Sequence, residues 1–349
     1  MLHQPFYDPN KTYEENFTEG PFGAFAENQK YTIFGINVRF PFGIAAGPLL
    51  NSNYVIAALD KGFDIVVYKT VRTQKYPCNE WPNVLGISIK GNLTLQNAEK
   101  GVIGTHVFTK QLAVTNSFGV PSFEPKFWMK DLANAVAYAR KGQLVIGSFQ
   151  GTVNKDGNIA AYIRDFAEAA KMVKQTGVKV LEANLSCPNE GNSHLLCFDI
   201  ERTTQIIKEI RKEIGKTPLI IKIAYFEDKK QLEKLIHNVG RYIDGIAAIN
   251  TIPAKILNKK GEQALPGGPG RLRAGVCGKP IQWAGLKTVK ELKRIRKALG
   301  LSYLIFGTGG VVQSDDYKKY KDSGADVVMS ATGAIWNPYL AMEIKKKYS

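Results

Sequence analysis

The segment 181–192, LEANLSCPNEGN, ends an apolar run with a cluster of groups that could do chemistry. Cys187 lies between Asn184 and Asn189, and a proline follows the thiol directly. Most lone cysteines are small buried hydrophobes, but a thiol in cationic surroundings can lose its proton and then accept one from a substrate. Asparagine offers both a donor and an acceptor, which suits a planar ligand with amide-like edges. The segment therefore predicts a site for proton transfer to Cys187.

Two lysines fall inside apolar runs that are typical of strands. Lys69 ends the run DIVVYK, and Lys222 lies within PLIIKI. A cationic side chain inside a strand is costly to bury unless it meets an anion or a carboxylate. The two lysines are therefore consistent with structural ion pairs at the end of a sheet, or with one shared anionic ligand.

Two turns rich in small residues follow later apolar runs, GTGG at 307–310 and ATG at 331–333. Small residues leave backbone N–H groups accessible to a ligand. In α/β barrels, the turns after the seventh and eighth strands are the usual phosphate site. Either turn alone is a weak signal, but together they predict a phosphorylated ligand.

The order of the apolar runs predicts how these residues are positioned. From about residue 40, the sequence repeats a short β-branched run, a polar or glycine-rich turn and an amphipathic helix. Eight such repeats favour a closed (β/α)8 TIM barrel over a doubly wound sheet, and the carboxyl ends of barrel strands meet at one mouth. The expected strands are residues 42–46, 64–69, 143–148, 178–184, 218–223, 245–250, 303–307 and 326–330.

Three further segments depart from this repeat. Residues 31–40 predict an N-terminal hairpin that closes the barrel bottom, and residues 71–125 and 251–282 predict long active-site loops after strands two and six. We expect residues 1–349 to form a single domain, with residues 1–30 as an N-terminal extension of unknown role.

The composition is that of an enzyme-sized globular protein, with 44% hydrophobic and 22% charged residues. The net charge of +16 raises the possibility of nucleic-acid binding, but the lysines alternate with apolar residues at helical spacing, which favours a solvated surface. The four cysteines form no C-x-x-C pair, which favours reduced thiols and no metal site. Without a long apolar run or a secretory signal, we expect a cytoplasmic protein with no membrane span.

The motifs NLSCPN, YKT, TNSFGVP, IKI, AINT and GTGG occur in one consistent order between residues 41 and 333. In this they resemble the dihydroorotate dehydrogenase family, and the cysteine of NLSCPN resembles its class 1, soluble branch. The resemblance implies FMN-dependent oxidation of dihydroorotate to orotate in de novo pyrimidine (UMP) biosynthesis. It makes Cys187 the base that removes the C5 proton, while C6 gives a hydride to N5 of FMN.

The same resemblance assigns residues to the two ligands, although Ser122 stands where many soluble relatives have asparagine. For substrate binding it implies Lys69, Asn116, Asn184, Asn189, Asn250 and Thr251. For FMN binding it implies Ala46, Gly47, Lys69, Thr70, Asn184, Lys222, Gly275, Gly309, Gly310, Ala331 and Thr332.

Two alternatives stay open at this point. Another FMN-dependent pyrimidine reductase or dehydrogenase of the same barrel type also fits NLSCP, although Asn189 and the strand lysines favour the carboxylated substrate. A basic nucleic-acid-binding barrel without redox activity would explain the charge but not the Cys187 segment. The electron acceptor is open between fumarate, a partner electron-transfer subunit and others, and class 1 relatives suggest a homodimer.

Overall fold

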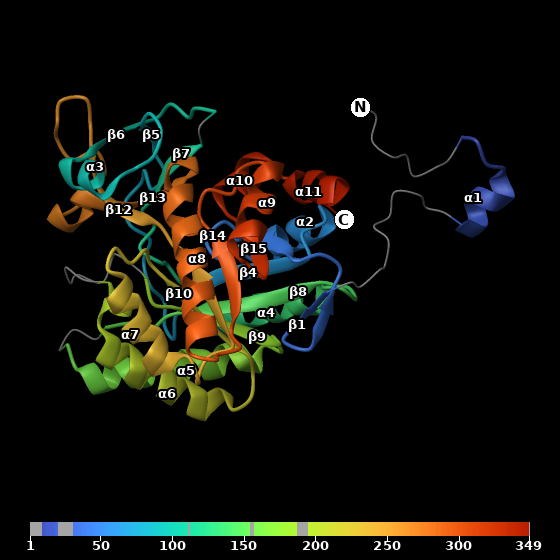
Figure 1. The fold of residues 1–349 in the computed structure, drawn as a ribbon, viewed down its shortest axis with the longest axis horizontal. Helices are drawn as coiled ribbons and strands as arrows, with labels where there is room; N and C mark the ends of the chain where they lie inside the picture. Colours follow the sequence, from blue (N-terminus) through green and yellow to red (C-terminus); the bar gives the residue numbers. More distant parts are fainter. Residues whose placement is uncertain (1–8, 20–30, 111, 154–156, 187–194, 349) are drawn as a thin grey trace.

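The computed structural model describes residues 9–19, 31–110, 112–153, 157–186 and 195–348. Eight parallel strands close into a barrel, and each corresponds to one of the predicted strands, so the (β/α)8 prediction is confirmed (Figure 1). In chain order the barrel strands are β3 (Phe42–Ile44), β4 (Ile65–Val71), β8 (Leu144–Phe149), β9 (Val180–Asn184), β10 (Leu219–Ile223), β11 (Gly245–Ala248), β14 (Leu304–Thr308) and β15 (Val327–Ser330).

Helices surround the barrel because each has one apolar stripe that needs cover. On α6, for example, Ile206, Ile210 and Ile214 are fully buried. The side chain of Asp199 caps the start of this helix by accepting a hydrogen bond from the backbone N–H of Arg202. The surrounding helices are α2 (Ser52–Asp60), α4 (Pro125–Tyr138), α5 (Ile159–Gln175), α6 (Ile200–Ile214), α7 (Lys229–Val239), α8 (Gln282–Ala298), α9 (Ser314–Ser323) and α11 (Leu340–Tyr348).

Short helices complete the chain, and none of the described helices is long and apolar enough to cross a bilayer. They are α1 (Tyr13–Glu19), α3 (Leu95–Lys100), α10 (Thr332–Trp336) and the 3₁₀ turns η1 (Leu196–Phe198), η2 (Pro269–Leu272) and η3 (Lys279–Ile281).

The predicted hairpin, β1 (Tyr31–Ile33) and β2 (Ile36–Val38), covers the N-terminal end of the barrel. Its buried side chains join the apolar cluster inside the barrel, and the Phe34 ring stacks on Phe306 with centroids 5.9 Å apart. The prediction that this hairpin closes the barrel bottom is confirmed.

Next to the hairpin, a buried charged cluster ties the C-terminal helix α11 to the start of β4. Lys345 Nζ lies 2.5 Å from a carboxylate oxygen of Asp64, and Arg39 lies 3.8 Å from the other oxygen. Burial raises the pKa of Asp64 and lowers the pKa of Lys345, in each case against the attraction of the other group. The cluster joins two distant parts of the sequence at the closed end of the barrel.

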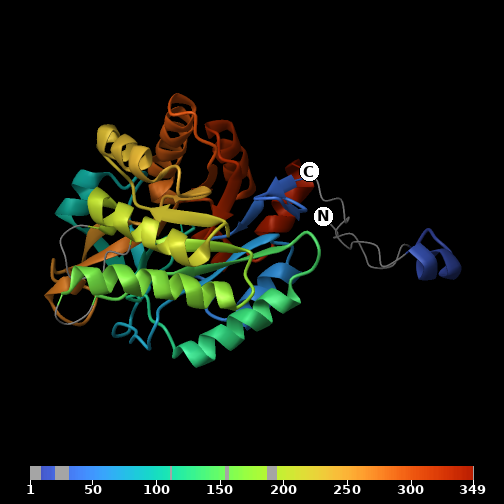
Figure 2. The ribbon, with the colours of Figure 1, turned by 90° about the horizontal axis from the view of Figure 1, so that it is seen from below.

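The two insertions after the second and sixth barrel strands are where predicted, but they are more than loops. They contain five short strands that pair with one another in a second closed sheet. The small sheet and the hairpin lie on opposite sides of the barrel in both views (Figures 1 and 2). The strands are β5 (Gly86–Ser88), β6 (Val102–Thr105), β7 (Ala113–Asn116), β12 (Ile252–Leu257) and β13 (Arg273–Gly278).

Candidate active site

The interior of the barrel changes from apolar to polar along its axis. Because side chains alternate along a strand, every second residue faces the interior. On β9 the series of inward side chains begins with Val180, which belongs to the interior apolar cluster, and continues through Glu182 to Asn184. On β10 it begins with Ile220 and continues to Lys222, whose strand partner is Asn184. The polar residues therefore gather at the carboxyl ends of the strands, where barrel enzymes hold their active sites.

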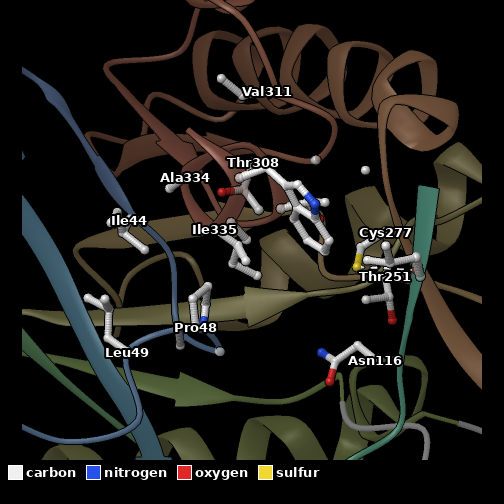
Figure 3. Close-up of a pocket in the computed structure, with 18 of the residues that line it drawn as sticks. Ile44, Pro48, Leu49, Asn116, Thr251, Cys277, Thr308, Val311, Ala334 and Ile335 are labelled. Carbon is white, nitrogen blue, oxygen red and sulfur yellow. Dashed lines mark hydrogen bonds between the residues drawn. The ribbon is translucent and has the colours of Figure 1, made fainter. Parts of the chain in front are cut away.

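A cavity of about 450 Å³ opens at this end, and a small polar recess of about 40 Å³ adjoins it. Such a volume suits a ligand the size of a cofactor. In Figure 3, Ile44, Pro48 and Leu49 lie on one side of the cavity, and Asn116, Thr251 and Cys277 lie on the other. The cavity and the recess share the residues Ala46, Gly47, Asn116, Phe118, Lys222, Asn250 and Thr251.

The structure brings most of the predicted site residues to these two spaces. Gly275 lines neither space; it pairs with Asn116 in the small sheet. Cys187 and Asn189 lie outside the described residues. The predicted residues that line the cavity or the recess are Ala46, Gly47, Lys69, Thr70, Asn116, Asn184, Lys222, Asn250, Thr251, Gly309, Gly310, Ala331 and Thr332.

Side-chain amides form a connected network beside the recess. Asn184 donates from Nδ2 to Gln150 Oε1 at 2.8 Å, and its Oδ1 accepts from the backbone N–H of Ser186 at 3.4 Å. Asn250 donates from Nδ2 to the Ser186 hydroxyl at 2.9 Å and lies 3.3 Å from the Ser186 carbonyl oxygen. The two asparagines are thus held by Ser186, the last described residue before Cys187.

Lys222 is a buried cation with 4% of its surface exposed, and it lines both spaces. Within the described part of the chain its amino group forms no hydrogen bond or ion pair. Glu182 lies deeper in the barrel, where burial raises its pKa against the attraction of Lys222 and a hydrogen bond with Ser148. Glu182 therefore holds its proton more tightly than a solvated carboxyl group does, and Lys222 lies between it and the ligand spaces that it lines.

The turns after β14 and β15 lie against each other, as expected of a barrel phosphate site. The Ser330 hydroxyl donates to the Val311 carbonyl at 2.8 Å, and a Cβ on Gly333 would overlap the Val311 carbonyl oxygen. Gly309 and Gly310 have φ angles of +116° and +71°, which side chains rarely tolerate. The close contact of the two turns places Gly309, Gly310, Ala331 and Thr332 along one cavity wall.

The small sheet supplies another wall of the cavity, and its packing explains why residue 275 is a glycine. A Cβ on Gly275 would overlap the Thr251 hydroxyl, so glycine at this position lets Thr251 pack beside β13. Cys277, two residues further along, lines the cavity with its thiol. Burial raises the pKa of the Cys277 thiol to about 11, so it stays protonated near neutral pH and is a poor candidate for the base.

A buried arginine supports the rim of the recess, and the sequence analysis did not single it out. Arg72 donates from Nε to the Val120 carbonyl at 3.0 Å and from Nη1 to the Gly151 carbonyl at 2.8 Å. Val120 has a φ of +52°, which is unfavourable for a β-branched residue. Arg72 therefore stabilises a strained turn whose residues Gly119 and Val120 line the recess.

One part of the cavity was also not predicted. We call it the apolar wing; it lies between α2 and α10, and the side chains that define it carry one hydroxyl and one indole N–H as their polar groups. Lys61, which follows α2, also lines the cavity. The sequence showed these positions only as parts of amphipathic helices and turns. The apolar wing is lined by Pro48, Leu49, Leu50, Tyr54, Ala57, Ala58, Phe63, Val311, Ala334, Ile335, Trp336 and Pro338.

Fold and site together define a (β/α)8-barrel protein that can hold a phosphate-bearing cofactor beside a recess for a small amide-like ligand. Comparison with known proteins narrows this class. Residues 29–348 match the family model described as dihydroorotate dehydrogenase. The chain belongs to the dihydroorotate dehydrogenase family, whose members are flavin-dependent oxidoreductases.

Individual relatives agree with this family. The chain is 34% identical to the dihydroorotate dehydrogenase of Dictyostelium discoideum, over 98% of this chain and 97% of the relative. It is 28% identical to a dihydroorotate dehydrogenase (quinone) of an Arthrobacter species, over 93% and 86%. It is 27% identical to the catalytic subunit of a dihydroorotate dehydrogenase B (NAD(+)) of Thermodesulfovibrio yellowstonii, over 75% and 80%.

Among solved structures, the chain resembles DHODH from Eimeria tenella in complex with ferulenol. The TM-score is 0.70 at 18% identity, and the match covers 92% of this chain and 82% of that one. At this identity the likeness supports the fold.

Proposed function

We propose that this protein oxidises dihydroorotate to orotate in de novo pyrimidine biosynthesis, with FMN as its cofactor and the whole chain as one FMN-binding domain. The observation that carries the proposal is Lys222, a buried cation that faces the junction of the cavity and the recess without an ion pair among the described residues. A cation in this state is stabilised by an anionic ligand. The flavin and the carboxylated substrate both supply negative charge there.

The residues present fit a flavin mononucleotide in the larger cavity. Its volume is that of a cofactor site, and the paired turns after β14 and β15 offer one phosphate site. A Cβ on Gly47 would meet no atom within 4 Å, so the backbone there borders open space where a ring could lie. The proposed FMN residues are Ala46, Gly47, Lys69, Thr70, Asn184, Lys222, Gly275, Gly309, Gly310, Ala331 and Thr332.

The residues around the recess would bind and orient the substrate. Lys69 supplies positive charge for the carboxylate, and its Nζ lies 5.9 Å from the centre of the Phe118 ring. Asn184 and Asn250 present amide groups to the pyrimidine ring. With Asn116, Thr251 and Asn189, they make up the proposed substrate site.

Cys187 is the proposed base, because it follows Ser186 directly and Ser186 holds both asparagines. A thiolate there would remove the proton from C5 of dihydroorotate. When bound, FMN would supply the acceptor for the hydride that leaves C6. The chain itself then has to exclude water, orient the substrate and hold the abstracted proton on sulfur.

The electron acceptor is a second question, and the apolar wing bears on it. The resemblance of Cys187 to class 1 favours fumarate or a partner electron-transfer subunit. The apolar wing, in contrast, favours a flat apolar acceptor such as a quinone, because it opens from the same cavity and its lining is almost entirely hydrocarbon. A homodimer and a cytoplasmic location are also part of the proposal.

The primary test is anaerobic reduction of the purified protein by dihydroorotate, followed at the flavin absorbance band. We expect bleaching with dihydroorotate and none with dihydrouracil or dihydrothymine, the substrates of the rival pyrimidine enzymes. Acid release and mass analysis should give FMN. Finding flavin adenine dinucleotide, or no flavin after reconstitution, would contradict the cofactor assignment.

The acceptor test uses the same reduced protein. Fumarate, NAD(+) and a short-chain quinone are added separately, and the rate at which the flavin colour returns is compared. Leu49→Phe, which adds bulk to the apolar wing, should slow only an acceptor that enters there. Equal rates for this variant and the wild type with a quinone would remove the apolar wing as its site.

A further inference from the structure

Gln150 is a buried polar residue that lies outside both the proposed substrate site and the proposed FMN site. It follows β8 directly, is fully buried, and lies beside Asn184 because Phe149 and Ala183 are strand partners. The side chains meet: Asn184 Nδ2 donates to Gln150 Oε1 at 2.8 Å. A glutamine at this depth is costly unless its polar atoms are used.

Backbone groups fix which way the two asparagine amides point. The N–H of Ser186 can only donate, so the atom of Asn184 that faces it is Oδ1. The carbonyl of Ser186 can only accept, so the atom of Asn250 that faces it is Nδ2. These assignments do not depend on the usual ambiguity between amide oxygen and nitrogen.

Gln150 holds the Asn184 amide at the end opposite to Ser186. With Asn184 Oδ1 turned to Ser186, its Nδ2 must find an acceptor, and Gln150 Oε1 provides it. The amide of Asn184 is then held at both ends. An apolar residue at position 150 would leave Nδ2 without this acceptor, and the amide would then be held only through Oδ1, by contacts of 3.3 to 3.4 Å.

The fixed amides leave one donor and one acceptor for a ligand. Within the described part of the chain, one N–H of Asn184 remains after the bond to Gln150, and no hydrogen bond there uses Asn250 Oδ1. A ring amide, with N–H next to C=O, presents the complementary pair. The geometry therefore matches a cyclic amide edge in one orientation.

We propose that Gln150 is a positioning residue that locks the Asn184 amide in the orientation that Ser186 selects and thereby raises the affinity for the cyclic amide edge of the substrate. The inference rests on the proposed function, because it takes the recess as the substrate site. Gln150 acts through Asn184 and needs no contact with the ligand. Its removal should therefore weaken ligand binding more than it weakens the fold.

The test compares three variants with the wild type. Gln150→Met keeps the length of the side chain and removes the acceptor, whereas Gln150→Glu keeps an oxygen at the acceptor position. Gln143→Met is the matched control: it makes the same change just before the same strand, at the other end of the barrel, and it also removes side-chain hydrogen bonds, one exposed and one half-buried. The measurements are orotate binding by the change in flavin absorbance, KM, kcat, flavin content and melting temperature.

We expect Gln150→Met to raise the Kd of orotate and the KM of dihydroorotate by about 5- to 50-fold, as expected when a buried polar group is left mispaired. The kcat should fall much less, and flavin content and melting temperature should match those of Gln143→Met. Gln150→Glu should recover most of the affinity, and Gln143→Met should bind orotate like the wild type.

The outcomes separate this inference from the proposed function. If the wild type binds orotate and Gln150→Met binds it equally well, Gln150 is packing and the inference fails while the function stands. Equal losses in Gln150→Met and Gln143→Met would also overturn it, because the effect would then be one of stability. If the wild type neither binds orotate nor is reduced by dihydroorotate, the proposed function fails and the inference fails with it.

Discussion

Lys345 and Lys222 are both buried lysines, but they lie at opposite ends of the barrel and in different surroundings. Lys345, at the closed N-terminal end, lies 2.5 Å from the carboxylate of Asp64. Lys222, at the open end, forms no ion pair within the described part of the chain and lines both the cavity and the recess. The same residue type at similar burial thus has a protein partner at one end and a ligand space at the other.

The difference shows how the two ends divide their tasks. A buried ion pair gains little net stability, but it is expensive to break, so Asp64 and Lys345 lock α11 onto the barrel. A buried cation without a carboxylate partner instead lowers the stability of the ligand-free protein, and its cost is recovered when an anion binds. The buried ion pair thus lies at the hairpin end, and the buried lysine that faces the cavity and the recess lies at the end with the small sheet.

The largest expected effect tests whether a residue at the open end contributes to catalysis without contributing to the stability of the fold. Cys187→Ala should slow anaerobic flavin reduction by dihydroorotate about 10²- to 10⁴-fold, because the proposed proton acceptor is lost. Flavin content and melting temperature should stay at wild-type values. Stopped-flow absorbance measures the rate, and Cys78→Ala, at an exposed thiol, is the control. A wild-type rate in Cys187→Ala would assign the base elsewhere.

The next effect lies at the closed end. Lys345→Met should lower the free energy of unfolding by about 3–5 kcal/mol, because it leaves Asp64 buried without its nearest cation. Urea unfolding measures this loss. Activity per folded molecule should be unchanged, since the cluster is remote from the cavity. If Lys345→Met loses activity but not stability, the closed end does not have the structural role that the comparison with Lys222 assigns to it.

The same substitution at the open end should act in the opposite way. Lys222→Met should weaken FMN binding about 10- to 150-fold, the range of one charge-assisted hydrogen bond. The flavin-free protein should be as stable as the wild type or more stable, because an uncompensated buried charge is removed. Flavin titration and urea unfolding of the flavin-free protein give both numbers. If Lys222→Met is destabilised as much as Lys345→Met, Lys222 is a structural residue as well.

The smallest expected effect concerns Glu182, the buried carboxyl group that attracts Lys222. Its pKa is raised in the folded protein, so the folded state binds the proton more tightly than the unfolded state. The free energy of unfolding should therefore fall as the pH rises from the ordinary pKa of 4.5 toward the raised value. Glu182→Gln should remove this dependence in melting curves measured between about pH 4.5 and pH 8.

A different result for Glu182 would sharpen the comparison. If Glu182→Gln lowers stability at high pH, where an ionised Glu182 would matter most, then Glu182 and Lys222 form a functional ion pair. The open end would then resemble the closed end more closely than the contacts indicate.

Much of the fold could be predicted from the sequence because its signals are local. The barrel strands are short β-branched runs, and glycines such as Gly215 and Gly324 follow the last turns of their helices. The small sheet could not be predicted in this way. Its strands have three to six residues, and the pairings of β7 with β13 and of β6 with β12 join the two insertions, so the sheet is closed by tertiary contact.

The site was predictable to the same extent. Strand ends and a family motif indicated Asn184, Asn250 and Lys222, which the structure brings together. Gln150 stood at a strand end too, but only the register of β8 against β9 places it beside Asn184. The partner of Lys345 could not be found from the sequence, because Asp64 lies just before the second barrel strand, far from Lys345 in the chain, and nothing local links the two.

The pairing of the two insertions also has a consequence for how the chain reaches its final form. β7 and β13 are far apart in the sequence, and joining them closes one of the longest loops in the molecule. Contacts of such long range are slow to form, whereas neighbouring βα units can assemble as they leave the ribosome. Asn116 and Thr251 therefore meet only after β13 has been synthesised and docked. A nascent chain that ends before Gly278 would have most of its barrel strands but an incomplete ligand site. Cofactor binding could therefore not stabilise such a chain.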